Sequence, residues 1–273
     1  MPLTFQNRPS LIAYVTCGDP DLVTTRDIVV AAIDAGAEVI ELGVPFSDPV
    51  ADGPVIQRAS ERALRRGTTL KDVLKVAADV RSRRPAAGLI VFSYLNPLLR
   101  LGMDRFCAQA AEAGVDGALV TDLPVEEAGD YLRAMRERRL ATVFLAAPTS
   151  PDARLRRIAE TSTGFVYAVS RTGVTGKRQQ VAAEARQLVS RIRPFTSLPI
   201  AVGFGISSAE QVAEVGQFAD AAVVGSALVQ AVEEAAPGGG APQRVAELVK
   251  QLIAAGRHAS GTSSAAAAAS RRG

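Results

Sequence analysis

Eight short apolar stretches, rich in β-branched residues, recur along this chain and alternate with longer amphipathic stretches. The apolar stretches are LIAYVT (11–16), AEVIELG (37–43), GLIVFSY (88–94), GALVTD (117–122), ATVFLA (141–146), FVYAVS (165–170), IAVGFG (200–205) and AAVVG (221–225). They are continuously apolar and not alternating, which is typical of parallel strands buried on both faces. In the stretches between them, such as DLVTTRDIVVAAIDAG, apolar residues recur at spacings of three and four, which predicts amphipathic helices.

Eight strand–helix units in about 250 residues predict an α/β fold of the (β/α)8 TIM-barrel type. A doubly wound open sheet also alternates strands and helices, but it usually has fewer strands and a glycine-rich turn after the first. Here TCGDP follows the first strand instead. We therefore expect a single-domain barrel over residues 1–255, followed by a low-complexity, disordered tail over residues 256–273.

Composition narrows the class of protein. The 273 residues are 48% hydrophobic and carry a formal net charge of +3, with Lys and Arg spread along the chain. Such a mild excess suits an anionic small molecule, and no basic stripe or aromatic-rich motif indicates nucleic acid. Cys17 and Cys107 have neither metal-site nor disulfide spacing. No apolar run reaches membrane-spanning length, so we expect a cytoplasmic protein without a membrane or nucleic-acid partner.

The segment ELGVPFSDPVADGP (41–54) contains acidic residues at the carboxyl end of a predicted strand, where barrel enzymes have their catalytic residues. Glu41 falls at the carboxyl end of the second strand, and Asp52 lies in the long loop that follows. Because Glu41 stands between Ile40 and Leu42, it must be partly desolvated, which raises a carboxyl pKa toward the range useful for proton transfer. The alternatives are a salt bridge at the barrel rim for Glu41 and an ordinary turn residue for Asp52.

Glycines follow the last three strands, as GVTG (173–176), GFG (203–205) and GS (225–226). Glycines allow backbone N–H groups to approach a phosphate, and a helix starting at Ser226 adds its N-terminal dipole. Three such motifs on consecutive strands predict a phosphate site. No lysine stands at a strand end for a Schiff base, and the single histidine, His258, lies in the tail, so no metal site is indicated. Any carbon–carbon chemistry must therefore run on carboxylates.

ELGVPFSDPVADGP, TDLPVEE, SRTGVTG, GFGIS and VVGSALV together resemble the α subunit family of tryptophan synthase, over roughly residues 11–255. The resemblance implies a (β/α)8 carbon–carbon lyase of tryptophan biosynthesis. Such an enzyme cleaves indole-3-glycerol phosphate to indole and glyceraldehyde 3-phosphate. It also implies an α2β2 heterotetramer, in which a β subunit with pyridoxal phosphate receives the indole through a tunnel, and no cofactor in this chain.

The resemblance assigns roles residue by residue. The general acid–base falls on Glu41, and Asp52 accepts the indole N–H. Tyr167 matches the tyrosine beside the catalytic glutamate, and Tyr14 and Phe92 are candidates for the indole pocket or ordinary core aromatics. The phosphate-binding positions match Gly176, Phe204, Gly205, Gly225 and Ser226, and the loop that closes over the substrate contains Arg171 and Thr175.

Only about ten residues precede the first strand, so the helix that covers the barrel bottom in this family is expected to be short or absent. We predict that a β subunit docks on the loops after the second and third strands, where SYLNPLLRLG presents Leu98, Leu99 and Leu101. The alternative for these leucines is packing onto the third helix. Three alternatives remain: a sugar-phosphate isomerase on the same fold, a stand-alone indole-releasing lyase and a non-catalytic regulatory subunit. The presence of both Glu41 and Asp52 argues against the last.

Overall fold

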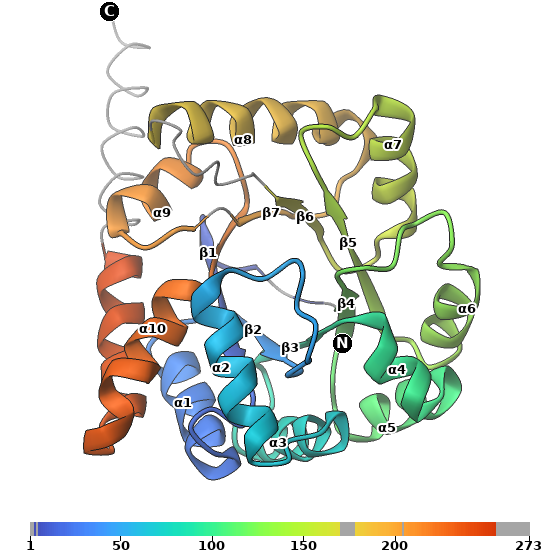
Figure 1. Cartoon of the computed structure of the whole chain (residues 1–273). Coiled ribbons are helices and arrows are strands. Elements are labelled where there is room, and N and C mark those ends of the chain that lie inside the picture. Colours follow the sequence, from blue (N-terminus) through green and yellow to red (C-terminus); the bar gives the residue numbers. More distant parts are fainter. Residues whose placement is uncertain (1–2, 4, 170–177, 204, 255–273) are drawn as a thin grey trace, which may run out of the picture.

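The eight strands close into one parallel barrel in sequence order, with β8 paired to β1. In the computed structural model, which describes residues 3, 5–169, 178–203 and 205–254, the helices form a ring around the strands (Figure 1). The TIM barrel predicted from the sequence is therefore confirmed. The predicted tail, residues 256–273, lies outside the described residues. Within the described ranges, no helix has the length and apolar character needed to cross a bilayer.

Each strand begins and ends within two residues of its predicted bounds. The strands are β1 (Ser10–Thr16), β2 (Val39–Gly43), β3 (Gly88–Ser93), β4 (Gly117–Val120), β5 (Ala141–Ala146), β6 (Val166–Val169), β7 (Ile200–Gly203) and β8 (Ala221–Val224). The helices are α1 (Leu22–Asp34), α2 (Pro54–Arg65), α3 (Leu70–Arg83), α4 (Leu95–Leu101), α5 (Met103–Glu112), α6 (Gly129–Glu137), α7 (Asp152–Thr161), α8 (Arg178–Ile192), α9 (Ala209–Val215) and α10 (Ser226–Ala235). Two short 3-10 turns (Arg193–Phe195 and Ala236–Gly238) and a last helix over residues 241–254 complete the chain described.

Side chains of each strand alternate between the barrel interior and the surrounding helices. On β2, Val39 belongs to the interior cluster, whereas Ile40 and Leu42 pack in the layer between strands and helices. Since the side-chain period of a strand is two residues, Glu41 faces the interior, one layer nearer the carboxyl end than Val39. The strand is apolar on both faces except at this position.

An extended N-terminal segment covers the amino end of the barrel. The described part of residues 1–9 contains no helix, in line with the short or absent cover expected from the sequence. Leu3 and Phe5 pack against the interior cluster, and the Phe5 ring meets that of Phe165 edge to face, with centroids 5.9 Å apart. Apolar side chains of the terminus therefore close this end of the barrel.

Three acids at the amino end, Glu38, Asp116 and Asp220, each stand directly before an even-numbered strand. The carboxylate of Asp116 accepts hydrogen bonds from Arg81 Nη2 at 2.7 Å and from the backbone N–H of Leu89 at 2.8 Å. The donors to Asp220 are Arg8, Arg193 and the Ile200 N–H, and those to Glu38 are the Gln6 and Asn7 N–H groups, the Asn7 amide and Ser10 Oγ. These carboxylates join neighbouring strands, and each accepts two or more hydrogen bonds.

The segment after β3 differs from the prediction, because much of the expected loop is helix α4. Pro97 lies in the first turn of α4, where the missing N–H removes no hydrogen bond. Leu98 is buried in the core, so the prediction that it is presented at the rim is wrong, and Leu101 is half-buried against the core. Leu99 is 56% exposed and does lie open at the rim.

Candidate active site

Glu41 is a buried acid at the carboxyl end of β2. Its residue is 1% exposed, and among the described residues neither carboxyl oxygen of Glu41 has a hydrogen-bond partner. Across the sheet it is in register with Tyr14 on β1 and with Ile90 on β3. Burial raises the pKa of Glu41 from its ordinary 4.5 to about 8. At neutral pH the group therefore holds a proton that it can give to a bound molecule.

Two tyrosines reach across the mouth of the barrel above this acid. A Cβ atom on Gly43 would lie 2.3 Å from the Tyr14 hydroxyl, and one on Gly203 would lie 2.3 Å from the Tyr167 hydroxyl. Each ring is thus accommodated by a glycine on the neighbouring strand. Burial raises the pKa of both hydroxyls well above the ordinary value, and the charge of Glu41 contributes to both shifts. Both tyrosines therefore lie within electrostatic reach of Glu41 and stay protonated.

Phe92 completes an aromatic wall on the β3 side of the mouth. Its ring meets the Tyr14 ring edge to face, with centroids 5.2 Å apart and an interplanar angle of 79°. Phe92 is half-buried and packs against both the interior cluster and a small cluster centred on Tyr14. A flat apolar ring is the kind of ligand that such a wall favours.

Asp52 lies in the loop between β2 and α2, and Tyr94 holds this loop in place. The Tyr94 hydroxyl donates to Asp52 Oδ2 at 3.2 Å and accepts from the Ala51 N–H at 3.0 Å. The Tyr94 ring also stacks on Phe46 of the same loop, with centroids 5.0 Å apart. Burial raises the pKa of Asp52 from its ordinary 3.8 to about 6, and the Tyr94 hydrogen bond opposes this rise.

The sequence prediction missed Tyr94 as a site residue. It directly follows β3 and is separated from Asp52 by 42 positions. The only available signal was an aromatic residue at the carboxyl end of a barrel strand, where functional side chains gather.

Backbone amides are available at the carboxyl ends of β7 and β8. Helix α10 begins at Ser226, and its N-cap, Gly225, has no side chain to cap the first N–H groups. Gly205 follows β7 with a φ of +63°, a conformation that favours glycine. An anion is well accommodated by such a helix N-terminus. The other predicted substrate-binding residues, Arg171, Thr175, Gly176 and Phe204, lie outside the described residues.

Glu41 and the N-terminus of α10 lie at the same end of the barrel, which is the carboxyl end of the strands. That is where (β/α)8 enzymes carry out their chemistry, whereas the opposite end serves stability. Fold and site together therefore define this protein as a (β/α)8 barrel with a candidate catalytic site at the carboxyl end of its strands. In the described part of the chain, no group of three or more His, Cys, Asp or Glu side chains is placed to hold a metal ion.

Comparison with known proteins identifies the family within this class. The family model for the tryptophan synthase alpha chain matches residues 2–259. The alpha chain of Solibacter usitatus is 55% identical over 229 residues, covering 84% of this chain and 85% of that one. The alpha chain of Burkholderia lata is 46% identical over 260 residues, covering 94% and 96%. The chain belongs to the tryptophan synthase alpha chain family, and it is an enzyme of tryptophan biosynthesis.

Solved structures of the same family share the fold. Tryptophan synthase subunit alpha from Legionella pneumophila superposes with a TM-score of 0.85 at 35% identity, covering 92% of this chain and 93% of that one. A tryptophan synthase chain from M. tuberculosis gives a TM-score of 0.83 at 39% identity, covering 92% and 94%. Release of indole from indole-3-glycerol phosphate and partnership with a β subunit follow from membership of this family.

Proposed function

We propose that this protein cleaves indole-3-glycerol phosphate by a retro-aldol reaction in which Glu41 moves the protons and Asp52 binds the indole N–H. The observation that carries the proposal is the buried Glu41 carboxyl, which has no hydrogen-bond partner among the described residues and a pKa near 8. An acid in this state can both deliver and remove a proton near neutral pH.

The reaction divides into two proton transfers. The Glu41 carboxylic acid first gives its proton to C3 of the indole ring, and positive charge develops at the ring nitrogen. Asp52, ionised above about pH 6, accepts the N–H hydrogen bond and stabilises that charge. The Glu41 carboxylate then removes the proton of the side-chain hydroxyl. The electron pair of the carbon–carbon bond returns to the ring, which yields indole and an aldehyde and restores the acid.

The aromatic and glycine residues supply binding. We assign the indole pocket to Tyr14 and Tyr167, which lie within electrostatic reach of Glu41, and to Phe92, whose ring meets that of Tyr14. We assign binding of the substrate phosphate to Gly205, Gly225 and Ser226, and the N-terminus of α10 supports this assignment. Arg171, Thr175, Gly176 and Phe204 remain proposed substrate residues on the basis of family resemblance. With these assignments the substrate spans the mouth of the barrel from β2 to β8.

The β subunit is proposed to dock on the same end of the barrel. Val50, in the loop between β2 and α2, is 87% exposed, and Leu99 on α4 is 56% exposed. The hydrogen bond from Ala51 to Tyr94 ties this loop to the segment that leads into α4. Exposed apolar side chains beside the mouth suit a partner that captures a neutral, apolar product. We propose an α2β2 heterotetramer in which pyridoxal phosphate belongs to the β subunit and this chain needs no cofactor.

The remaining proposals concern the chain as a whole. We propose residues 1–255 as the catalytic domain, and the tail over residues 256–273 stays a prediction from the sequence alone. The enzyme acts as a carbon–carbon lyase in the cytoplasm. Two buried thiols, Cys17 and Cys107, support this location, because unpaired cysteines are typical of reducing compartments.

The test is indole release from indole-3-glycerol phosphate by the purified chain, with and without a matching β subunit. We expect measurable release alone and faster release in the complex, because docking orders the loop that carries Asp52. Turnover that stays flat as the complex forms would leave a stand-alone lyase. Isomerisation of a sugar phosphate without indole release would overturn the proposal.

A further inference from the structure

Two helices carry the opposite ends of the proposed substrate site. Helix α2 begins two residues after Asp52, and helix α10 begins directly after Gly225. Under the proposed function, the first helix therefore fixes the indole side of the site and the second fixes the phosphate side. A substrate that bridges both ends requires a fixed distance between the two N-termini.

Near the barrel, the two helices pack against each other through apolar side chains. Ala59 of α2 and Val229 of α10 are buried in one cluster with Tyr14, and Ile56 packs against it. A Cβ atom on Gly225 would lie 3.8 Å from Ile56 Cδ1, so the start of α10 is in van der Waals reach of α2. This contact is not directional, and apolar packing alone permits small sliding movements.

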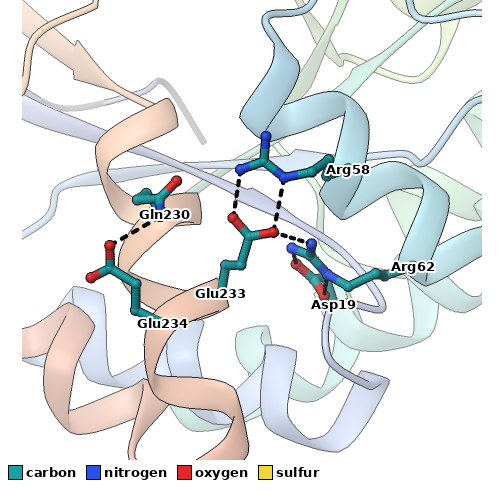
Figure 2. A network of polar contacts seen from close by, with 6 residues as sticks. All are labelled: Asp19, Arg58, Arg62, Gln230, Glu233 and Glu234. Atoms are coloured by element: carbon teal, nitrogen blue, oxygen red, sulfur yellow. Dashed lines mark hydrogen bonds and ion pairs between the residues drawn. The ribbon is translucent and has the colours of Figure 1, made fainter.

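Further out, a chain of four charges joins the helices (Figure 2). The Glu233 carboxylate of α10 lies between two arginines of α2. Arg58 donates to it through Nε at 3.0 Å and through Nη2 at 2.7 Å, and Arg62 donates through Nη1. Arg62 also forms a two-point contact with Asp19, at 2.8 and 2.7 Å, in the segment after β1. Glu233 therefore joins α10 to α2, and Arg62 joins α2 to the segment after β1.

The network contains equal numbers of positive and negative charges, and directional hydrogen bonds hold the four side chains in place. Two carboxylates alternate with two guanidinium groups, and the Asp19 side chain is only 3% exposed. The hydrogen bonds from Arg58 lower the pKa of Glu233 to about 2, so the carboxylate is ionised throughout the neutral range. Two-point contacts between Arg and a carboxylate are directional, unlike apolar packing. They therefore oppose sliding between the helices.

We propose that Glu233 is a positioning residue that sets the spacing between the indole and phosphate ends of the site. This role rests on the proposed function, because that function assigns the two ends. Glu233 touches no substrate atom in this scheme. It acts through α10 and α2, so its removal should affect a ligand that bridges both ends and should spare a ligand that occupies one.

The experiment compares a bridging ligand with its two halves. The bridging ligand is 3-(indol-3-yl)propyl phosphate, which lacks the reacting hydroxyl, and the halves are indole and glycerol 3-phosphate. Calorimetric titration gives the three dissociation constants for the full-length native chain, for Glu233→Gln and for Glu234→Gln. Glu234 is the matched control, because it lies on the same helix and carries the same charge. Among the residues that the structure describes, its side chain bonds within its own helix, accepting from the Gln230 amide at 2.9 Å (Figure 2).

We expect Glu233→Gln to weaken the bridging ligand by about tenfold to a hundredfold and to leave each half within about twofold of native. Glu234→Gln should leave all three constants unchanged. Should Glu233→Gln fail to fold, Arg58→Gln removes the exposed half of the same contact and is expected to show the same pattern. The positioning role is overturned if the bridging ligand keeps native affinity, or if the halves weaken as much as the whole.

If the proposed function is wrong, the experiment gives a different result from the one expected when only the positioning role is wrong. If the bridging ligand binds the native chain but no indole is released from indole-3-glycerol phosphate, the reaction assignment is wrong and the positioning role stands. If the bridging ligand does not bind the native chain, both proposals are overturned.

Discussion

Acidic side chains at the two ends of the barrel sit in opposite surroundings. At the amino end, Asp116 receives hydrogen bonds from Arg81 and from a strand N–H, and Asp220 and Glu38 are similarly surrounded by donors. At the carboxyl end, Glu41 is more deeply buried, at 1% exposed, yet among the described residues it has no hydrogen-bond partner. The same chemical group is held by donors at one end and has a raised pKa at the other.

The two environments differ in how the carboxyl group affects the stability of the fold and in the pKa that they give it. A buried carboxylate with charge-assisted hydrogen bonds holds neighbouring strands together, and losing its partner is expensive. A buried carboxyl without partners destabilises the folded state unless it stays protonated. That destabilisation is tolerated where function needs it, because the pKa it produces is the one that proton transfer requires. The comparison therefore separates residues that serve folding from residues that serve chemistry.

The largest effect should come from Glu41→Gln. The amide keeps the shape of the acid but cannot pass a proton, so we expect indole release to fall by about two to four orders of magnitude. Binding of glycerol 3-phosphate should be retained. Steady-state assays of indole release from indole-3-glycerol phosphate measure this, and a variant that keeps more than a tenth of native turnover would remove Glu41 from the mechanism.

The same substitution should stabilise the protein at alkaline pH. Between pH 4.5 and about 8, the unfolded chain has released the Glu41 proton while the folded chain still holds it. Stability therefore falls as pH rises through this window, by up to about 1.4 kcal/mol per pH unit from this group. Urea unfolding at pH 5, 6.5 and 8 should show that native and Glu41→Gln diverge with pH, the variant being the more stable at pH 8. Parallel curves would contradict the high pKa.

At the amino end of the barrel, Asp116→Ala should lower the free energy of unfolding and leave the activity nearly unchanged. It removes the acceptor of Arg81 Nη2 and of the Leu89 N–H, while Arg81 keeps its hydrogen bonds to backbone carbonyls. The Asp116 side chain is 10% exposed and the Arg81 side chain 21%. We expect a loss of about 3 kcal/mol in the free energy of unfolding. Turnover per folded molecule should stay near native. Glu61→Ala is the control, because the Glu61–Arg65 pair is largely exposed and should contribute less than about 0.5 kcal/mol.

The smallest effect should come from Tyr94→Phe, which keeps the ring stacked on Phe46 and removes the hydroxyl that holds Asp52. We expect a loss of about tenfold in kcat/KM. The Tyr94 hydrogen bond lowers the pKa of Asp52, so the acidic limb of the pH–rate profile should move to higher pH in the variant. Tyr131→Phe is the control, because the Tyr131 hydroxyl bonds the backbone of β4 far from the loop. Identical pH–rate profiles for the two variants would show that the Tyr94 hydroxyl does not affect the pKa of Asp52.

The fold was predictable because its signal is local and repeated. Strands such as Ala141–Ala146 are continuous apolar runs, and their bounds can be read directly from the sequence. Helix α4 was missed for a local reason as well. The segment was expected to be a loop, yet its Pro97 lies in the first turn of a helix, where a proline breaks no hydrogen bond. The buried Leu98 could be recognised only once α4 was packed on the core.

The site was predictable where one strand determines it and not where two loops meet. Glu41 could be placed at the carboxyl end of β2 because an acid interrupts an apolar run. The contact of Tyr94 with Asp52 joins segments 42 positions apart, and only barrel closure brings them together. The glycines that accommodate the tyrosine rings, Gly43 and Gly203, were equally hidden, since each serves a side chain from the adjacent strand.

The aromatic residues at the mouth of the barrel also make the site visible in solution. The chain has four tyrosines and no tryptophan, and three of the tyrosines, Tyr14, Tyr94 and Tyr167, line the mouth or hold its loop. Near-ultraviolet absorbance, circular dichroism and fluorescence of this protein therefore arise mainly from the place where ligand binds. Occupancy and loop order can be followed optically on the unlabelled chain, with Tyr131 as a constant background.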